Sequence, residues 1–208
     1  MAATKLTRDV IVDAAFAVLD EHGIDGLTVR ALAAELGVKA PALYWHLANK
    51  QAVLDEMGTE VASRIQRSLG DLDDIATLAE ALRAYALAAR AEYLRHRDGA
   101  RTFSGTRLTD PDLLRDRESA LARWVNEGYS IEQISDAFEI VTAYVIGFVI
   151  EEQERTQSAE GRYDLQARDA VVGEDRPLTV ASGHHLFRPA DQKFAEQLAL
   201  IIPALVRQ

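Results

Sequence analysis

The feature of this sequence that most limits its fold is a helical spacing of apolar residues along nearly the whole chain. Between Val10 and Leu205, apolar residues recur three and four positions apart, and no segment shows a convincing strand-like alternation. We therefore predict an all-α fold, with an N-terminal helix-turn-helix domain of three helices and a larger C-terminal helical domain.

Capping residues and helix breakers divide this pattern into separate helices. Thr7, Asn49 and Ser130 can each cap a helix N-terminus, and Gly23 can end the first helix. Pro41 suits the first position of a very short third helix. The predicted helices span residues 7–23, 28–37, 41–47, 50–69, 74–97, 111–128, 131–156 and 190–207.

The C-terminal part of the chain carries two irregular features. Residues 157–190 are polar and lack sustained periodicity, so we predict a surface excursion with one short helix near 164–172. Pro203 lies inside the last predicted helix and should kink it or end it early, because proline removes one backbone hydrogen bond.

Composition excludes several classes of protein. With no cysteine among its 208 residues, the chain cannot form a disulfide scaffold, a cysteine-ligated zinc site or an iron–sulfur cluster. We find no uninterrupted apolar run of transmembrane length and no signal-peptide pattern at the N-terminus. We therefore expect a cytoplasmic protein that does not bind a membrane.

Charge is distributed unevenly along this acidic chain, whose formal net charge is −10. Residues 1–50 hold five basic and six acidic residues, and no acidic residue occurs between Glu35 and Asp55. A polyanion could approach this acid-free stretch without repulsion. A buried helix would explain the missing acids equally well.

The spacing of Ala33 and Gly37 predicts a helix-turn-helix. A small side chain at Ala33 allows two helices to cross closely, and Gly37 permits the sharp turn between them. The third helix would then present its first turn to a DNA major groove. Tyr44, Trp45 and nearby polar side chains offer donors toward phosphates, although the two aromatics could instead form the core of a small bundle.

Two groups of residues resemble a known family. The segments 23–38 and 41–50 resemble the DNA-binding domain of the tetracycline repressor (TetR) family, and the likeness covers nearly all of residues 7–60. A weaker likeness to the tetracycline-repressor branch covers Tyr93–Ala100, the Gly105–Thr106–Arg107 turn, Asn126–Ser130 and Gly147–Glu154.

This resemblance implies a homodimeric transcriptional repressor that a small-molecule effector releases from a palindromic double-stranded DNA operator. It implies a DNA-binding domain over residues 1–50, a connecting helix over 51–69, and a ligand-binding and dimerisation domain over 70–208. A DNA-binding regulator that responds to no ligand is the first alternative, and an all-helical small-molecule-binding protein or enzyme is a less favoured one. We expect neither an enzyme nor a cofactor, because the chain has no H-E-x-x-H, G-x-S-x-G or phosphate-loop motif. His184 and His185 have no metal-ligand partner at helical spacing, and we expect them to be solvated.

The resemblance also implies DNA-contacting positions. Thr28 and Lys50 would hold phosphates, and Arg30 would reach a base edge, a contact worth about 1–3 kcal/mol of discrimination. Ala40 and Ala42 stand where the tetracycline-repressor branch has polar base-reading side chains, so the operator sequence does not carry over. The expected DNA-binding residues are Thr28, Arg30, Lys39, Ala40, Pro41, Ala42, Tyr44, Trp45, His46 and Lys50.

The long helix over 131–156 carries two apolar rows, and the last helix carries two more. A helix that is apolar on two faces needs cover on both, so one face is expected to meet a second copy of the chain. Complete burial within one chain is the alternative. The predicted dimer-interface residues are Val141, Val145, Phe148, Leu198 and Ile202.

The effector pocket is expected between the helices over 74–97, 111–128 and 131–156 and the turn over 103–107. Its predicted lining is mostly apolar, as ligand sites usually are, although each aromatic could equally belong to the core. The predicted ligand-binding residues are Gln66, Tyr85, Phe103, Thr106, Arg107, Leu121, Trp124 and Phe138.

The same turn argues against a magnesium–tetracycline sensor. The tetracycline-repressor branch holds the metal with a histidine where this chain has Phe103, which has no lone pair for a hard cation. Tyr85 and Ala89 replace drug-contacting asparagine and phenylalanine residues. Glu151 matches an acidic residue near the metal but cannot hold the ion alone. We therefore expect no metal and a flat, largely apolar effector.

Overall fold

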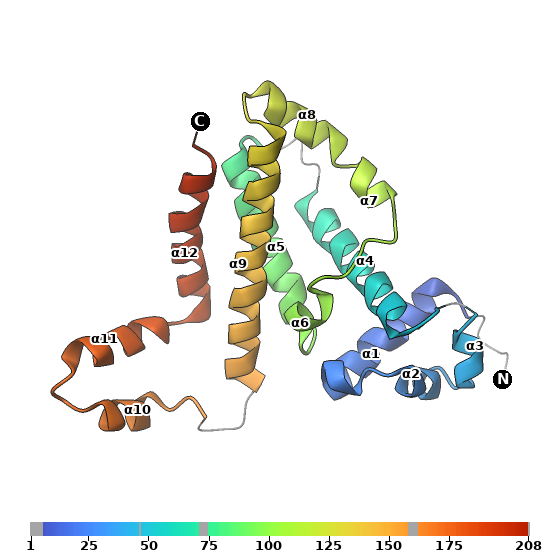
Figure 1. The fold of residues 1–208 in the computed structure, drawn as a ribbon, viewed down its shortest axis with the longest axis horizontal. Coiled ribbons are helices and arrows are strands. Elements are labelled where there is room, and N and C mark those ends of the chain that lie inside the picture. Colours follow the sequence, from blue (N-terminus) through green and yellow to red (C-terminus); the bar gives the residue numbers. More distant parts are fainter. Residues whose placement is uncertain (1–5, 46, 71–74, 158–161, 208) are drawn as a thin grey trace.

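The computed structural model describes residues 6–45, 47–70, 75–157 and 162–207, and these contain helices and no strand. Figure 1 shows a small domain of α1–α3 at one end of α4, a tall helical group around α5 and α9, and an arm of α10 and α11. The all-α prediction is confirmed for the described residues. His46, one of the predicted DNA contacts, lies outside them.

The N-terminal helices are α1 (Arg8–Gly26), α2 (Val29–Glu35), α3 (Ala40–Leu43) and α4 (Lys50–Leu69), and capping residues define where most of them begin. The side chains of Thr7, Thr28 and Asn49 accept backbone hydrogen bonds at three of the helix starts. Gly23 has a φ of +70° but only kinks α1, which continues to Gly26. The third helix is shorter than predicted.

The C-terminal helices differ from prediction at several boundaries. A capping box of Thr77 and Glu80 starts α5 (Leu78–Leu94), so the helix predicted from residue 74 begins later. The helix predicted over 111–128 is divided into α7 (Asp112–Arg115) and α8 (Glu118–Asn126). The remaining helices are α6 (Gly99–Phe103), α9 (Ile131–Gln157), α10 (Leu165–Val172), α11 (Pro177–Leu186) and α12 (Ala190–Leu205).

The polar excursion contains more structure than predicted. The short helix expected near 164–172 is present as α10, and α11 is a second helix that the sequence pattern missed. Its apolar residues do not follow a single face, which is why a periodicity search overlooks it. Pro203 lies inside α12, which ends at Leu205.

The core of the larger domain forms where α5 packs against α9, α4 and α12. By length and composition, α9 could cross a membrane. The sequence analysis did not predict this, because it considered only uninterrupted apolar runs. One such helix is weak support for a membrane segment, because the core helix of a soluble protein passes the same test. Here one face of α9 packs against α5 and α12 within the chain.

The five residues predicted for the dimer interface lie inside the protomer. Val141, Val145 and Leu198 are fully buried, and Phe148 and Ile202 are nearly so. The opposite face of α9 stays open, where Ile140 is 46% exposed. Both helices do carry two apolar rows. The five predicted residues belong to the rows that face the protomer's own core, and periodicity alone does not say which row does so.

Candidate DNA-binding and effector-binding sites

The turn between α2 and α3 has the geometry that the Ala33–Gly37 spacing predicts. Ala33 is buried, and Gly37 has a φ of +64°, the left-handed conformation that favours glycine. The amides of Gly37 and Val38 donate to the carbonyls of Ala34 and Ala33, at 3.1 and 2.9 Å. Leu43 is buried and anchors α3, whereas Pro41 of the same helix is exposed.

The aromatic residues that follow α3 face solvent. Tyr44 is 56% exposed and Trp45 is 89% exposed, so the alternative of a small aromatic core is wrong. Arg30, Lys39 and Pro41 are also exposed, and Ala40 and Ala42 are half-buried. This surface is rich in donors and contains no carboxylate between residues 36 and 54, which suits a polyanion.

Two predicted phosphate contacts also have structural roles. The Oγ1 of Thr28 accepts a hydrogen bond from the Ala31 amide at 3.1 Å and caps α2. The Nζ of Lys50 donates to the carbonyl of Ile24 at 2.9 Å and joins the start of α4 to the end of α1. The sequence carried no signal for the Lys50 contact, because its partner is a backbone atom of a distant residue.

A cavity of about 580 Å³ lies in the larger domain between α4, α5, α8, α9 and the loop after α6. All the predicted ligand-binding residues line it except Arg107. The backbone amide of Arg107 donates to Oδ1 of Asp55 at 3.1 Å, which holds the loop against α4. Lining residues that the sequence missed include Gly58, Val61, Ile65, Tyr93, Ile134 and Thr142.

Several polar side chains of this cavity are paired with one another or with the backbone. The hydroxyl of Tyr85 lies 2.9 Å from Oγ1 of Thr142, which itself donates to the Phe138 carbonyl at 2.7 Å. The amide of Gln66 donates to Asp116 at 3.2 Å. Trp124 is 2% exposed, and its Nε1 is a buried donor with no hydrogen-bond partner among the described residues.

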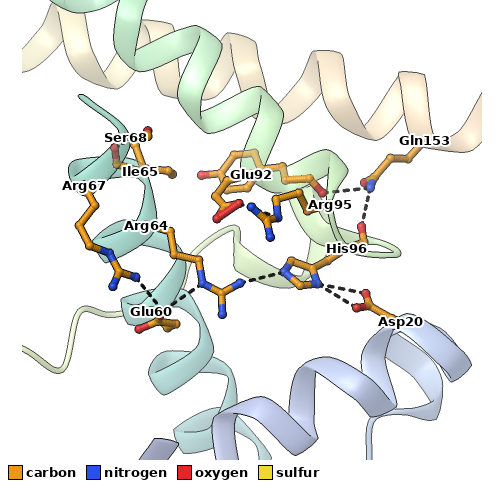
Figure 2. A network of polar contacts seen from close by, with 11 residues as sticks. Asp20, Glu60, Arg64, Ile65, Arg67, Ser68, Glu92, Arg95, His96 and Gln153 are labelled. Carbon is orange, nitrogen blue, oxygen red and sulfur yellow. Dashed lines mark hydrogen bonds and ion pairs between the residues drawn. The ribbon is translucent and has the colours of Figure 1, made fainter. Parts of the chain in front are cut away.

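Phe103 connects the cavity wall to the N-terminal domain. Its ring centroid lies 6.0 Å from that of Phe16 in α1 and 5.9 Å from that of His96. The imidazole of His96 stacks on Phe16 at 4.4 Å, and its Nδ1 lies 3.1 Å from both carboxylate oxygens of Asp20 (Figure 2). The amide of Gln153 in α9 donates to the His96 carbonyl at 2.8 Å and fixes the backbone there.

The acidic and histidine side chains named in the sequence lie away from the cavity lining. The side chain of Glu151 is 67% exposed and pairs with Arg155 at 3.7 Å. The Nε2 of His184 lies 2.6 Å from Oδ2 of Asp169, so this histidine is paired rather than simply solvated. Among the described residues, no cluster of three or more His, Asp or Glu side chains could hold a metal ion.

Comparison with known proteins identifies the family of each domain that holds these two sites. The family described as bacterial regulatory proteins, tetR family, matches residues 11–57, and the tetracyclin repressor-like C-terminal domain matches residues 72–207. The chain belongs to the TetR family. TetR-family proteins are DNA-binding transcriptional regulators and not enzymes, so α2 and α3 form the DNA-binding helix-turn-helix of this regulator.

Individual relatives match over almost the full TetR-family chain. Tetracycline repressor protein class A from transposon 1721 of Escherichia coli is 34% identical over 99% of this chain and 93% of its own length. A possible TetR family transcriptional regulator from Streptomyces coelicolor A3(2) superposes with a TM-score of 0.80 at 31% identity, covering 96% and 98% of the two chains. A single-residue variant of TetR from Acinetobacter baumannii AYE, solved in complex with minocycline, has a TM-score of 0.73 at 32% identity and 96% coverage of each chain.

Proposed function

We propose that this TetR-family repressor leaves a palindromic operator in the cytoplasm when a flat, largely apolar effector with a hydrogen-bond acceptor fills the cavity. The observation that carries this proposal is the unpaired indole N–H of Trp124 in a wall that is largely, though not wholly, aromatic and aliphatic. A buried donor without a partner costs about 1–3 kcal/mol, and a ligand acceptor at this position would recover that cost.

The aromatic side chains of the cavity suit a planar ligand. Trp124 lies 5.7 Å from Phe138, and Phe138 meets Tyr85 edge-on at 5.5 Å, measured between ring centroids. Such rings pack well against a flat ring system of the ligand. The cavity volume of about 580 Å³ falls in the usual range for sites that bind small organic molecules.

The lining of the cavity disfavours a ligand that arrives as a metal complex. Phe103 occupies the position where the tetracycline-repressor branch places a metal-binding histidine, and Phe103 itself packs against Phe16 and His96. Thr106 donates its hydroxyl to the Phe103 carbonyl at 2.9 Å, and Arg107 does not line the cavity. We therefore assign ligand recognition to Trp124 and its aromatic neighbours, rather than to the Thr106–Arg107 pair.

The dimer that the TetR family implies would use the open faces of α9 and α12. Ile140, Ala143 and Gly147 lie on one exposed line of α9, and Ala199 and Leu200 are exposed on α12. Two copies of each helix can close into a four-helix bundle around a two-fold axis. Such a dimer would place two recognition helices about 34–36 Å apart, as a palindromic operator requires.

Release of the operator can be measured directly. Fluorescence anisotropy of labelled operator DNA, bound to the repressor, would be titrated with flat aromatic ketones and phenols, and separately with tetracycline plus magnesium. We expect release by members of the aromatic panel that carry an acceptor, and weaker release from the Trp124→Phe variant. Phenylalanine keeps most of the ring packing but lacks the N–H donor.

Two results would contradict this proposal. Tight, magnesium-dependent release by tetracycline would require a metal site that the cavity lining does not supply. Equal effector affinity of the wild-type and Trp124→Phe proteins would remove the indole from ligand recognition. A repressor that no compound releases would favour the ligand-independent alternative.

A further inference from the structure

A second concave site lies between α4 and α5, outside the effector cavity. This groove encloses about 470 Å³ and is lined by three side chains of α4, three of α5 and Arg95, the residue that caps the C-terminus of α5. Figure 2 shows the basic side chains of both helices around it. The lining residues are Arg64, Arg67, Ser68, Ala88, Ala91, Glu92 and Arg95.

The groove concentrates positive charge in a chain whose net charge is −10. Its lining holds three arginines and one glutamate, and the small side chains of Ala88 and Ala91 leave open space beside them. The Glu92 side chain is only 8% exposed and lies 3.3 Å from Arg95. With Glu60, which pairs with Arg64 and Arg67, the site holds three guanidinium groups and two carboxylates, so it keeps an excess of one positive charge.

Two of these arginines already converge on one oxyanion position. The Nε of Arg64 and the Nη2 of Arg67 both donate to the same oxygen, Oε1 of Glu60, at 3.0 Å each. Each guanidinium carries five N–H donors in a planar fork. Arg67 and Arg95 also keep side-chain exposures of 66% and 68%, so a molecule from solvent can reach them.

The position of the groove separates it from both sites described above. From Lys50 to Arg67, α4 rises about 25 Å, so the groove lies away from the start of α4 that follows the recognition helix, although Arg64 at its edge lies 4.6 Å from the ring centroid of Phe16 in α1. The effector cavity is lined by other residues of α4 and α5, including Gly58, Ile65 and Tyr85. The two helices thus form a shared wall, with a largely apolar cavity on one side and a cationic groove on the other.

We propose that this groove binds a compact oxyanion with several acceptor oxygens, such as a polycarboxylate or a phosphate. Arg67 and Arg95 would hold it from the two helices by charge-assisted, bidentate hydrogen bonds. Arg64 would donate further hydrogen bonds to the anion from the side of the groove near His96, where its Nη1 also lies 3.4 Å from Nε2 of His96 (Figure 2). Because α4 and α5 each contribute charge, the bound anion would clamp the two helices together.

Binding can be tested on the DNA-free repressor, so the result does not depend on the effector proposal. Citrate and inorganic phosphate would each be titrated by isothermal calorimetry at constant ionic strength, with chloride as the reference salt. We expect saturable binding of at least one anion and a raised unfolding temperature in its presence. The Arg67→Gln/Arg95→Gln variant should bind at least about tenfold more weakly, because it loses two charge-assisted contacts.

Two further variants separate the groove from general charge effects. Arg83→Gln removes an exposed arginine of α5 that does not line the groove, and it should bind like the wild-type protein. Ala91→Leu fills the groove without changing charge, and it should weaken binding. Absence of saturable binding for both anions would overturn the proposal. So would undiminished binding by Arg67→Gln/Arg95→Gln or Ala91→Leu, or equal loss in Arg83→Gln.

Discussion

The imidazole of His96 lies 3.1 Å from both carboxylate oxygens of Asp20, and this contact joins the effector domain to α1 of the DNA-binding domain. The backbone amide of Arg97 donates to the same carboxylate at 3.1 Å. His96 also touches Phe103, which lines the effector cavity. One side chain therefore contacts both a wall of the cavity and the helix that carries the DNA-reading unit.

Replacing Asp20 by asparagine should weaken the coupling between effector and DNA. The neutral amide cannot accept hydrogen bonds at both atoms, so α1 would be held less firmly to His96. We expect effector affinity to stay unchanged in the absence of DNA, while the drop in operator affinity on effector binding shrinks. Calorimetry of effector binding and anisotropy of operator DNA measure the two quantities separately. Asp13→Asn, on an exposed part of α1, is the matched control.

Trp45→Ala should reduce operator affinity without reducing stability. Its side chain is 89% exposed, so its removal leaves no cavity in the core.

Lys50→Ala should differ from Trp45→Ala. It should weaken binding to all DNA sequences alike, and it should also lower the free energy of unfolding by about 1–2 kcal/mol, because the hydrogen bond to the Ile24 carbonyl is lost. Urea unfolding and salt-dependent DNA binding distinguish the two variants. Operator affinity that did not fall with salt would contradict a phosphate role.

The dimer face can be tested by placing a charge on either row of α9. Ile140→Asp changes the open face and should give a folded monomer. Phe148→Asp places the charge inside the protomer, where Phe148 packs on Phe194 at 4.9 Å, and should unfold or precipitate the protein. Light scattering reports the mass, and circular dichroism reports the helix content. A folded dimer of Ile140→Asp would show that the interface lies elsewhere.

Gly58→Ala should disturb the contact between α4 and the loop after α6. A methyl group at Gly58 would lie 2.1 Å from Oγ1 and 2.7 Å from Cβ of Thr106, so one of the two segments must move. We expect a loss of about 1–3 kcal/mol in the free energy of unfolding. Adding Thr106→Gly removes the clashing atoms and should recover part of that loss. Additive effects in the double variant would contradict direct contact.

The DNA-binding domain could be predicted largely because its signals are local. The caps at Thr7, Thr28 and Asn49 act within one helical turn, and the small residue at Ala33 and the glycine at position 37 set the helix-turn-helix. Thus the helix starts and the turn could be predicted from neighbouring residues, whereas the DNA-contacting positions were named from the family resemblance. The residues predicted to line the cavity were named mostly from the family resemblance.

Features that depend on distant partners could not be read in this way. Periodicity shows that α9 has two apolar rows, but the row that faces α5 and α12 depends on tertiary packing. Lys50 bonds to a backbone carbonyl, and Arg107 is held out of the cavity lining by its backbone contact with Asp55. Trp124 could be named as a lining residue, but only the packing around it reveals that its N–H lacks a partner.

The cavity places the side chains proposed to recognise the ligand apart from the side chain that contacts α1. Phe138 contacts both Trp124 and Tyr85, whereas Phe103 faces Phe16 and His96. Substitutions among the first three can therefore retune which compound is sensed while the connection to α1 stays intact. This separation makes the protein a suitable starting point for engineered biosensors, in which new ligand specificities are selected without changing the DNA-binding domain or its connection to the cavity.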